Sequence, residues 1–133
     1  MTAILPGATL GILGGGQLGR MMAMAARSLG YRVQVMDPDP SCPARFVVDA
    51  CYQGGWDDVR AAANLARGSD VVTLEIEQIS IASLEAAARY APVRPGIAAM
   101  TMIQDRILQK AWLTDHGFPV GAYQPAHSLH DLE

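Results

Sequence analysis

Neither a long apolar run nor a run of basic residues occurs in this sequence of 133 residues. No apolar stretch approaches the roughly 20 residues that cross a bilayer as a helix, so we expect no membrane span. The net charge is −3 and Lys110 is the only lysine, which argues against a nucleic-acid-binding surface. The first eight residues lack the charged start and apolar core of a secretory signal, so we expect a cytoplasmic protein.

Cysteine is equally scarce, because Cys42 and Cys51 are the only two in the chain. Their spacing fits no metal-binding motif, and without an export signal we expect both to be reduced thiols. Internal repeats and low-complexity tracts are also missing. The composition, 50% hydrophobic and 17% charged, is typical of one soluble globular domain with a buried core.

What the sequence does contain is an alternation of strand-like and helical runs. The strand-like runs lie at 9–13, 31–37, 46–54 and 70–77. The helical runs lie at 18–29, 56–68, 79–90 and 99–117. Such alternation predicts βαβ units with right-handed crossovers and a parallel sheet covered on both faces. We therefore expect a doubly wound, Rossmann-like, three-layer α/β/α fold, in which the first, second and fourth strands are parallel neighbours.

A glycine-rich loop joins the first strand to the first helix. Residues 14–19, GGGQLG, fit the pattern G-x-G-x-x-G in the strand–helix context that this motif requires. Gly14 would permit the tight turn, Gly16 would let a ligand approach the backbone, and Gly19 would let the helix pack against the strand. The free N–H groups at the start of the helix favour an anionic ligand. We expect the three methionines of this helix to pack in the core.

On spacing alone, the loop has several possible ligands. Asp37 lies 18 residues beyond Gly19, where a dinucleotide-binding domain uses an acidic residue to hold ribose hydroxyls. An oxidoreductase domain that binds NAD(P) or a flavin through Gly14, Gly16, Gly19 and Asp37 is therefore one interpretation. A non-catalytic domain that binds a regulatory nucleotide is another. In a third, the glycines only shape the turn.

Two carboxylates follow the fourth predicted strand. Glu75 and Glu77 are two residues apart and would share a face if the strand continued through them. Ligands of open α/β sheets bind at the carboxyl ends of the strands. Carboxylates there disfavour a polyphosphate and suit a ligand that also carries an amine or ribose hydroxyls. Alternatively, Glu77 caps the following helix.

A third polar cluster lies within the last predicted helix. Arg106, Gln109 and Lys110 fall on nearby faces of that helix, and Asp105 precedes them as a possible cap or salt-bridge partner. On spacing alone, this cluster is equally well explained as a solvated helix face.

Taken together, these motifs resemble the N-terminal domain of the N5-carboxyaminoimidazole ribonucleotide synthase family. Members of this family are also called the ATPase subunit of phosphoribosylaminoimidazole carboxylase, and the family belongs to the ATP-grasp superfamily. The matching segments are GILGGGQLGRMM (11–22), VMDPDPSCPA (35–44), TLEIEQI (73–79), IQDRILQKAWL (103–113) and HGFPVGAY (116–123). The related formate-dependent glycinamide ribonucleotide transformylases have glutamate at the position of Gln17.

The resemblance implies a fold like the N-terminal domain of biotin carboxylase, and a reaction. ATP and bicarbonate would carboxylate 5-aminoimidazole ribonucleotide in purine biosynthesis, in an enzyme that is expected to be a homodimer. It also implies that Gly16, Gln17, Leu18 and Glu75 bind the ribonucleotide and that Arg106 binds ATP. Asp37 has no dinucleotide role in this interpretation.

The resemblance also divides the chain. Residues 1–118 would form the substrate-binding, or preATP-grasp, domain, and 119–133 a linker or the start of the ATP-grasp domain. The family's phosphate lid and magnesium ligands lie in parts that this sequence lacks. We therefore assign no catalytic and no metal-binding residue within 1–133, expect ATP and Mg²⁺ to be held mainly elsewhere, and expect this chain alone to be inactive.

Overall fold

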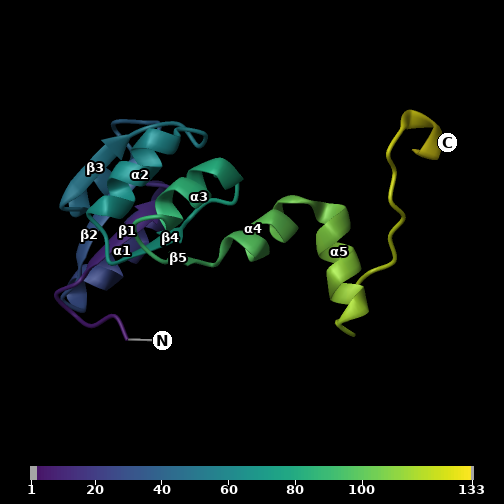
Figure 1. The fold of residues 1–133 in the computed structure, drawn as a ribbon, viewed down its shortest axis with the longest axis horizontal. Coiled ribbons are helices and arrows are strands. Elements are labelled where there is room, and N and C mark those ends of the chain that lie inside the picture. The colour runs from purple at the N-terminus through teal and green to yellow at the C-terminus, as the bar shows by residue number, and fades with distance from the viewer. Residues whose placement is uncertain (1–2, 133) are drawn as a thin grey trace.

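The computed structural model describes residues 3–132, and its centre is a parallel β-sheet (Figure 1). Within these residues five strands pair in the order β3-β2-β1-β4-β5, and every pairing is parallel. The strands are β1 (Thr9–Leu13), β2 (Arg32–Asp37), β3 (Ala50–Gln53), β4 (Val71–Leu74) and β5 (Val93–Arg94). The predicted fold class and the predicted neighbours of the first strand are therefore confirmed.

Helices cover both faces of this sheet. The helices of the described chain are α1 (Gln17–Ser28), α2 (Val59–Arg67), α3 (Ile81–Ala88), α4 (Ile97–Gln104), α5 (Arg106–Asp115), and two short 3₁₀ helices, η1 (Pro43–Val47) and η2 (Leu129–Leu132), of which α1, η1, α2 and α3 cover the sheet. On one face α1 and η1 pack over Ile12, Val33 and Val35. On the other face α2 and α3 pack over Leu13 and Val72. Adjacent residues of β1 thus enter opposite cores, as expected for a strand buried on both sides.

The strand register aligns the ends of the three central strands. Leu13 of β1 pairs with Met36 of β2 and with Leu74 of β4. The residues that follow these three positions therefore emerge together at one edge of the sheet. This edge carries the glycine loop, Asp37 and Glu75.

The predicted helix over 99–117 is two helices instead of one. α4 ends at Gln104, and Asp105 takes an extended conformation with φ −107° and ψ 111°. Its carboxylate accepts hydrogen bonds from the N–H groups of Ile107 and Leu108 at 2.8 and 3.0 Å. Asp105 is therefore the N-cap of α5, and this capping competes successfully with a continuous helix.

Two of the three methionines of α1 do not lie in the core, contrary to the prediction. Met21 and Met24 are 64% and 52% exposed, and only Met22 packs against the buried cluster. The buried face of α1 consists of Gly19, Ala23 and Ala26. Small residues on this face bring the helix close to the sheet and turn Met21 and Met24 outward.

The helices α4 and α5 extend away from the sheet and form an arm (Figure 1). Met100 is the only buried residue of α4, and α5 has none. Between α5 and η2 the described chain forms no regular secondary structure. No helix in residues 3–132 is long and apolar enough to cross a membrane.

Candidate functional site

The glycine loop between β1 and α1 has the backbone geometry that its sequence predicted. Gly14 has φ +107°, a conformation that residues with a side chain rarely adopt, and its N–H donates to the carbonyl of Met36 at 2.9 Å. A Cβ on Gly19 would collide with the carbonyl oxygen of Gly14. The predicted roles of Gly14 in the turn and of Gly19 in close helix packing are both confirmed.

The start of α1 has no side-chain cap. Gly16 is the N-cap and supplies no side-chain hydrogen bond, and the first turn contains no acidic residue. The N–H groups of a first helical turn have no partner within the helix and carry partial positive charge. Gln17 and Leu18 are exposed and Gly16 is half-buried.

Glu75 lies against this loop, although 59 residues separate it from Gly16 in the sequence. Its N–H donates to the carbonyl of Leu13 at 2.9 Å, which fixes Glu75 directly after β4. A Cβ built on Gly16 would lie 3.0 Å from Oε1 and 3.4 Å from Oε2 of Glu75. The half-buried carboxylate therefore lies beside Gly16, and two predicted site residues come together.

Glu77 does not cap the following helix. That cap is Ser80, whose hydroxyl oxygen accepts a hydrogen bond from the N–H of Ser83 at 3.1 Å. The backbone carbonyl of Glu77 accepts a hydrogen bond from the side-chain amide of Gln104 at 2.7 Å, and its own side chain is exposed. Because β4 ends at Leu74, the two glutamates lie in a loop rather than on one face of a strand.

Asp37 points into the loop instead of outward. One carboxylate oxygen accepts the N–H of Gly15 at 2.8 Å, and the other accepts the N–H of Asp39 at 2.9 Å. The residue is only 8% exposed. Both oxygens are thus engaged with backbone groups, which speaks against the role of holding ribose hydroxyls of a dinucleotide.

The segment around Cys42 also supports the loop, and sequence reasoning missed this contribution. The N–H of Ala44 donates to the carbonyl of Gly15 at 2.8 Å, and a Cβ on Gly15 would meet Sγ of Cys42 at 2.5 Å. The one available signal was Pro43, which is typical of a helix start. Both cysteines are free, with their sulfur atoms 4.0 Å apart. Burial raises the pKa of Cys42 to about 11, so its thiol stays protonated at neutral pH.

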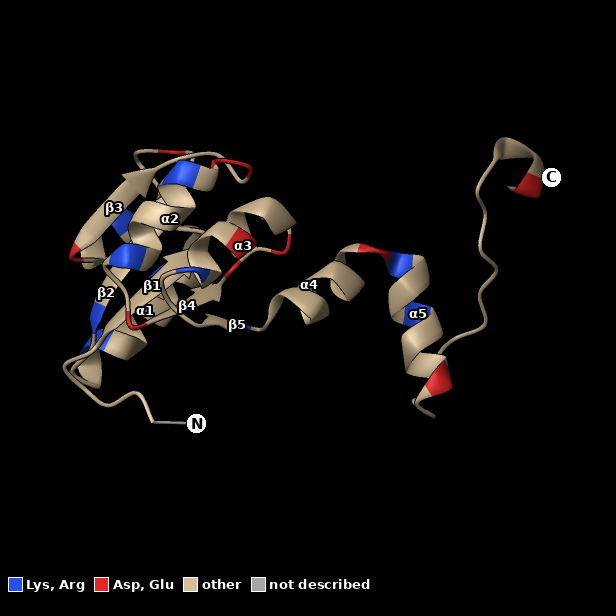
Figure 2. Ribbon diagram, in the orientation of Figure 1, with Lys and Arg blue, Asp and Glu red and all other residues tan. Residues whose placement is uncertain are grey.

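Arg106 is not brought to the glycine loop. It is the first residue of α5, on the arm that Figure 1 and Figure 2 show apart from the body of the molecule. Its guanidinium is exposed and donates to the side-chain oxygen of Gln109 at 2.5 Å. Lys110 lies 5.0 Å from the ring centroid of Tyr123, within cation–π range. Residues 3–132 contain no cluster of three or more His, Cys, Asp or Glu residues that could hold a metal ion.

The parallel sheet, the glycine loop and the helix start without a side-chain cap define a Rossmann-like domain. A comparison with protein families identifies the chain more narrowly than this general class. The model of the ribonucleotide synthetase preATP-grasp domain matches residues 7–104, and the chain belongs to this family.

Curated relatives and solved structures agree with this assignment. The N5-carboxyaminoimidazole ribonucleotide synthase of Brucella melitensis is 40% identical over 123 residues, which is 92% of this chain and 34% of the relative. The synthetase of Thermotoga maritima superposes with a TM-score of 0.85 at 35% identity, covering 93% of this chain and 35% of that one. The synthase of Aspergillus clavatus, in complex with ADP and 5-aminoimidazole ribonucleotide, superposes with a TM-score of 0.79 at 35% identity, covering 86% and 31%. The chain therefore spans about a third of the length of the relatives it matches.

Proposed function

We propose that this chain is the ribonucleotide-binding domain of an N5-carboxyaminoimidazole ribonucleotide synthase. In this reaction bicarbonate attacks the terminal phosphate of ATP, giving carboxyphosphate and ADP. Carboxyphosphate then releases phosphate, and its carboxyl group, as carbon dioxide, is taken by the amine of 5-aminoimidazole ribonucleotide, which loses a proton. Membership of the preATP-grasp family and the similarity to N5-carboxyaminoimidazole ribonucleotide synthases support this proposal.

The observation that carries the proposal is the carboxylate of Glu75 beside Gly16 at the uncapped start of α1. A ligand for this edge needs an anionic group for the helix start and hydrogen-bond donors for the carboxylate. A ribonucleotide has both, because it carries one phosphate together with ribose hydroxyls and an amine. The additional charge of a polyphosphate would be repelled by Glu75, which favours the ribonucleotide over ATP at this loop.

The roles of the predicted site residues follow from this arrangement. The backbone N–H groups of Gly16, Gln17 and Leu18 would hold the anionic part of the ribonucleotide, and Glu75 would accept hydrogen bonds from its hydroxyls or amine. Arg106 would reach ATP from the arm. ATP, Mg²⁺ and bicarbonate would be bound mainly by other parts of a longer protein. Residues 119–133 would link this domain to those parts. The longer protein would be a cytoplasmic homodimer.

The test uses the full-length protein and measures ADP release that depends on both bicarbonate and the ribonucleotide. Gly16 has φ −66° and ψ −162°, so Gly16→Val requires no left-handed backbone, and its side chain would occupy the space beside Glu75. We expect this variant to raise KM for the ribonucleotide about tenfold or more, as for a lost charged hydrogen bond, with KM for ATP nearly unchanged. Selective loss of ATP affinity would contradict the assignment.

The alternative of an NAD(P)-binding oxidoreductase domain has its own measurement. A dinucleotide domain binds NADH or NADPH at micromolar concentrations, which a fluorescence titration detects. Because Asp37 is engaged with the backbone, we expect no such binding. If NADH binds at micromolar concentrations and the ribonucleotide does not stimulate ADP release, the proposed function is wrong and the oxidoreductase alternative takes its place.

A further inference from the structure

We propose that Asp37 is a positioning residue that determines which backbone N–H groups the glycine loop presents to its ligand. The inference rests on the proposed function for the identity of that ligand. Asp37 itself touches no substrate in this account. It acts through Gly15, whose N–H donates to its carboxylate at 2.8 Å.

The two peptide groups around Gly15 are held in opposite senses. The N–H of Gly15 points to Asp37, so the carbonyl of Gly14 in the same trans peptide points away from Asp37. That carbonyl points toward Gly19, where it would collide with a Cβ. The carbonyl of Gly15 accepts the N–H of Ala44, so the N–H of Gly16 in that peptide points away from η1.

The backbone N–H groups of the loop therefore fall into two sets, one bound within the protein and one left for the ligand. Asp37 takes the N–H of Gly15 out of the ligand's reach, because this N–H already donates to its carboxylate. The N–H of Gly16 and those of the first turn of α1 remain for the ligand. Dinucleotide-binding domains use the acidic residue at the end of the second strand to hold a ribose. Here the residue at that place faces inward and shapes the loop.

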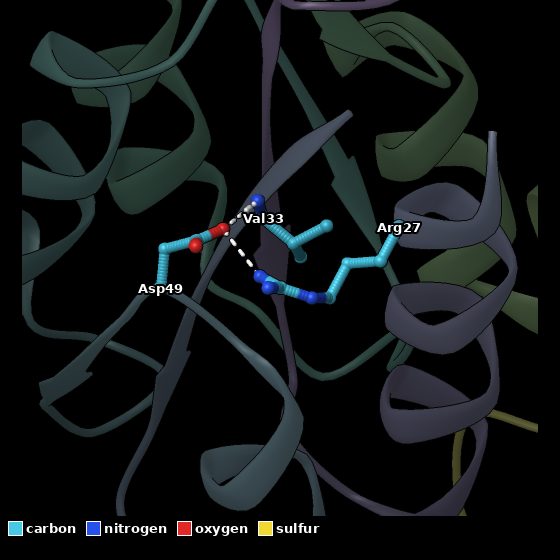
Figure 3. Close-up of polar contacts among 3 residues, drawn as sticks. All are labelled: Arg27, Val33 and Asp49. Atoms are coloured by element: carbon cyan, nitrogen blue, oxygen red, sulfur yellow. Dashed lines mark hydrogen bonds and ion pairs between the residues drawn. The ribbon is translucent and has the colours of Figure 1, made fainter. Parts of the chain in front are cut away.

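Asp49, which lies just before β3, offers a control because its carboxylate also binds a backbone N–H of β2. Its carboxylate accepts the N–H of Val33 at 2.8 Å and pairs with Arg27 at 2.8 Å (Figure 3). Val33 lies near the start of β2, whereas Asp37 ends it. Each aspartate therefore holds a backbone N–H, and only Asp37 contacts the glycine loop.

The experiment compares Asp37→Asn and Asp49→Asn in the full-length enzyme. We expect Asp37→Asn to raise KM for the ribonucleotide about tenfold, with kcat and KM for ATP within about twofold of the wild type. Asp49→Asn should leave both KM values unchanged. Equal effects of the two variants on the ribonucleotide, or an equal rise of KM for ATP in Asp37→Asn, would overturn the inference.

Hydrogen exchange of the same variants separates this inference from the proposed function, because it requires no activity. Asp37→Asn should speed exchange in the peptide that covers residues 14–18, whereas Asp49→Asn should not. An unchanged loop in Asp37→Asn overturns the inference even if the wild type proves to have another substrate. If Asp37→Asn and Asp37→Ser both fail to fold while Asp49→Asn folds, Asp37 is a folding determinant and the inference is also overturned.

Discussion

The body of the molecule and its C-terminal arm differ in how their residues are held. In the body, the sheet and its helices bury two apolar clusters, and backbone hydrogen bonds fix the glycine loop. In the described part of the arm, Met100 is the only buried residue of α4 and α5 has none. The loop is therefore preformed by this chain, whereas Arg106 projects from a helix that the body does not cover.

Apolar side chains of α5 are also left exposed. Leu108 and Trp112 are about half exposed, and with Met102 of α4 they line a shallow hollow. Trp112 stacks on His116 with ring centroids 3.9 Å apart, a contact within the arm itself. The glycine loop is thus held by contacts within the body, whereas α4 touches the segment after β4 through Gln104, which donates to the carbonyls of Glu77 and Ile79. Arg106, on the proposed ATP side, lies on α5 in the arm itself.

Truncating one leucine in each region should give the greatest difference in stability between the body and the arm. Leu65 of α2 is fully buried, and Leu108 of α5 is 51% exposed. Leu65→Ala should lower the free energy of unfolding of this chain by about 2–5 kcal/mol, because it leaves a cavity in the core. Leu108→Ala should change it by less than about 0.5 kcal/mol. Denaturant unfolding measures both, and similar losses would remove the distinction between body and arm.

A second comparison uses two glycines. Gly19→Ala places a methyl group against the carbonyl of Gly14 and should cost about 1–3 kcal/mol by overpacking. Gly121, in the segment after α5, has open space around a built Cβ, so Gly121→Ala should be nearly neutral. Thermal melting of the two variants checks this, and a Gly19→Ala protein as stable as Gly121→Ala would show that the loop is not tightly packed.

The smallest expected effect is a dependence of stability on pH at Asp49. The N–H of Val33 and then the guanidinium of Arg27 lower the pKa of Asp49 below its ordinary value of 3.8. A lowered native pKa stabilises the fold above the ordinary value, and this contribution is lost as pH falls through the native pKa. Asp49 is partly exposed, so the contribution should be below about 1 kcal/mol.

The measurement is the free energy of unfolding of the wild type and of Asp49→Asn across the acidic range. The difference between them should be largest at neutral pH and should vanish in strong acid. A difference that stays constant with pH would mean that the charge of Asp49 contributes nothing.

Sequence patterns predicted the architecture and the loop because both depend on local rules. Alternating runs define the βαβ order, and only glycine satisfies the turn at Gly14 and the close contact at Gly19. The end of β2 was predicted as the place of Asp37, but spacing fixes a position and not the direction of a side chain. Its inward orientation depends on Gly15, which is distant in sequence.

The remaining errors have the same physical origin. Periodicity predicted one helix over 99–117, and it could not weigh the capping of α5 by Asp105 against continuation. Hydrophobicity predicted that Met21 and Met24 are buried, although the small residues on the opposite face of α1 are the ones that pack. In each case the outcome was decided by the geometry of competing contacts, which composition does not contain.

The central claim is that Glu75, beside the glycine loop, binds the ribonucleotide, and Glu75→Gln tests it most directly. This change keeps the shape of the side chain and removes its charge. In the full-length protein it should weaken ribonucleotide binding about ten- to hundredfold, the effect of losing a charged hydrogen bond of roughly 1.5–3 kcal/mol. Glu77→Gln is the control and should leave affinity and stability unchanged, because Ser80 caps α3. Ribonucleotide affinity equal to the wild type in Glu75→Gln, measured by calorimetric titration, would contradict the account.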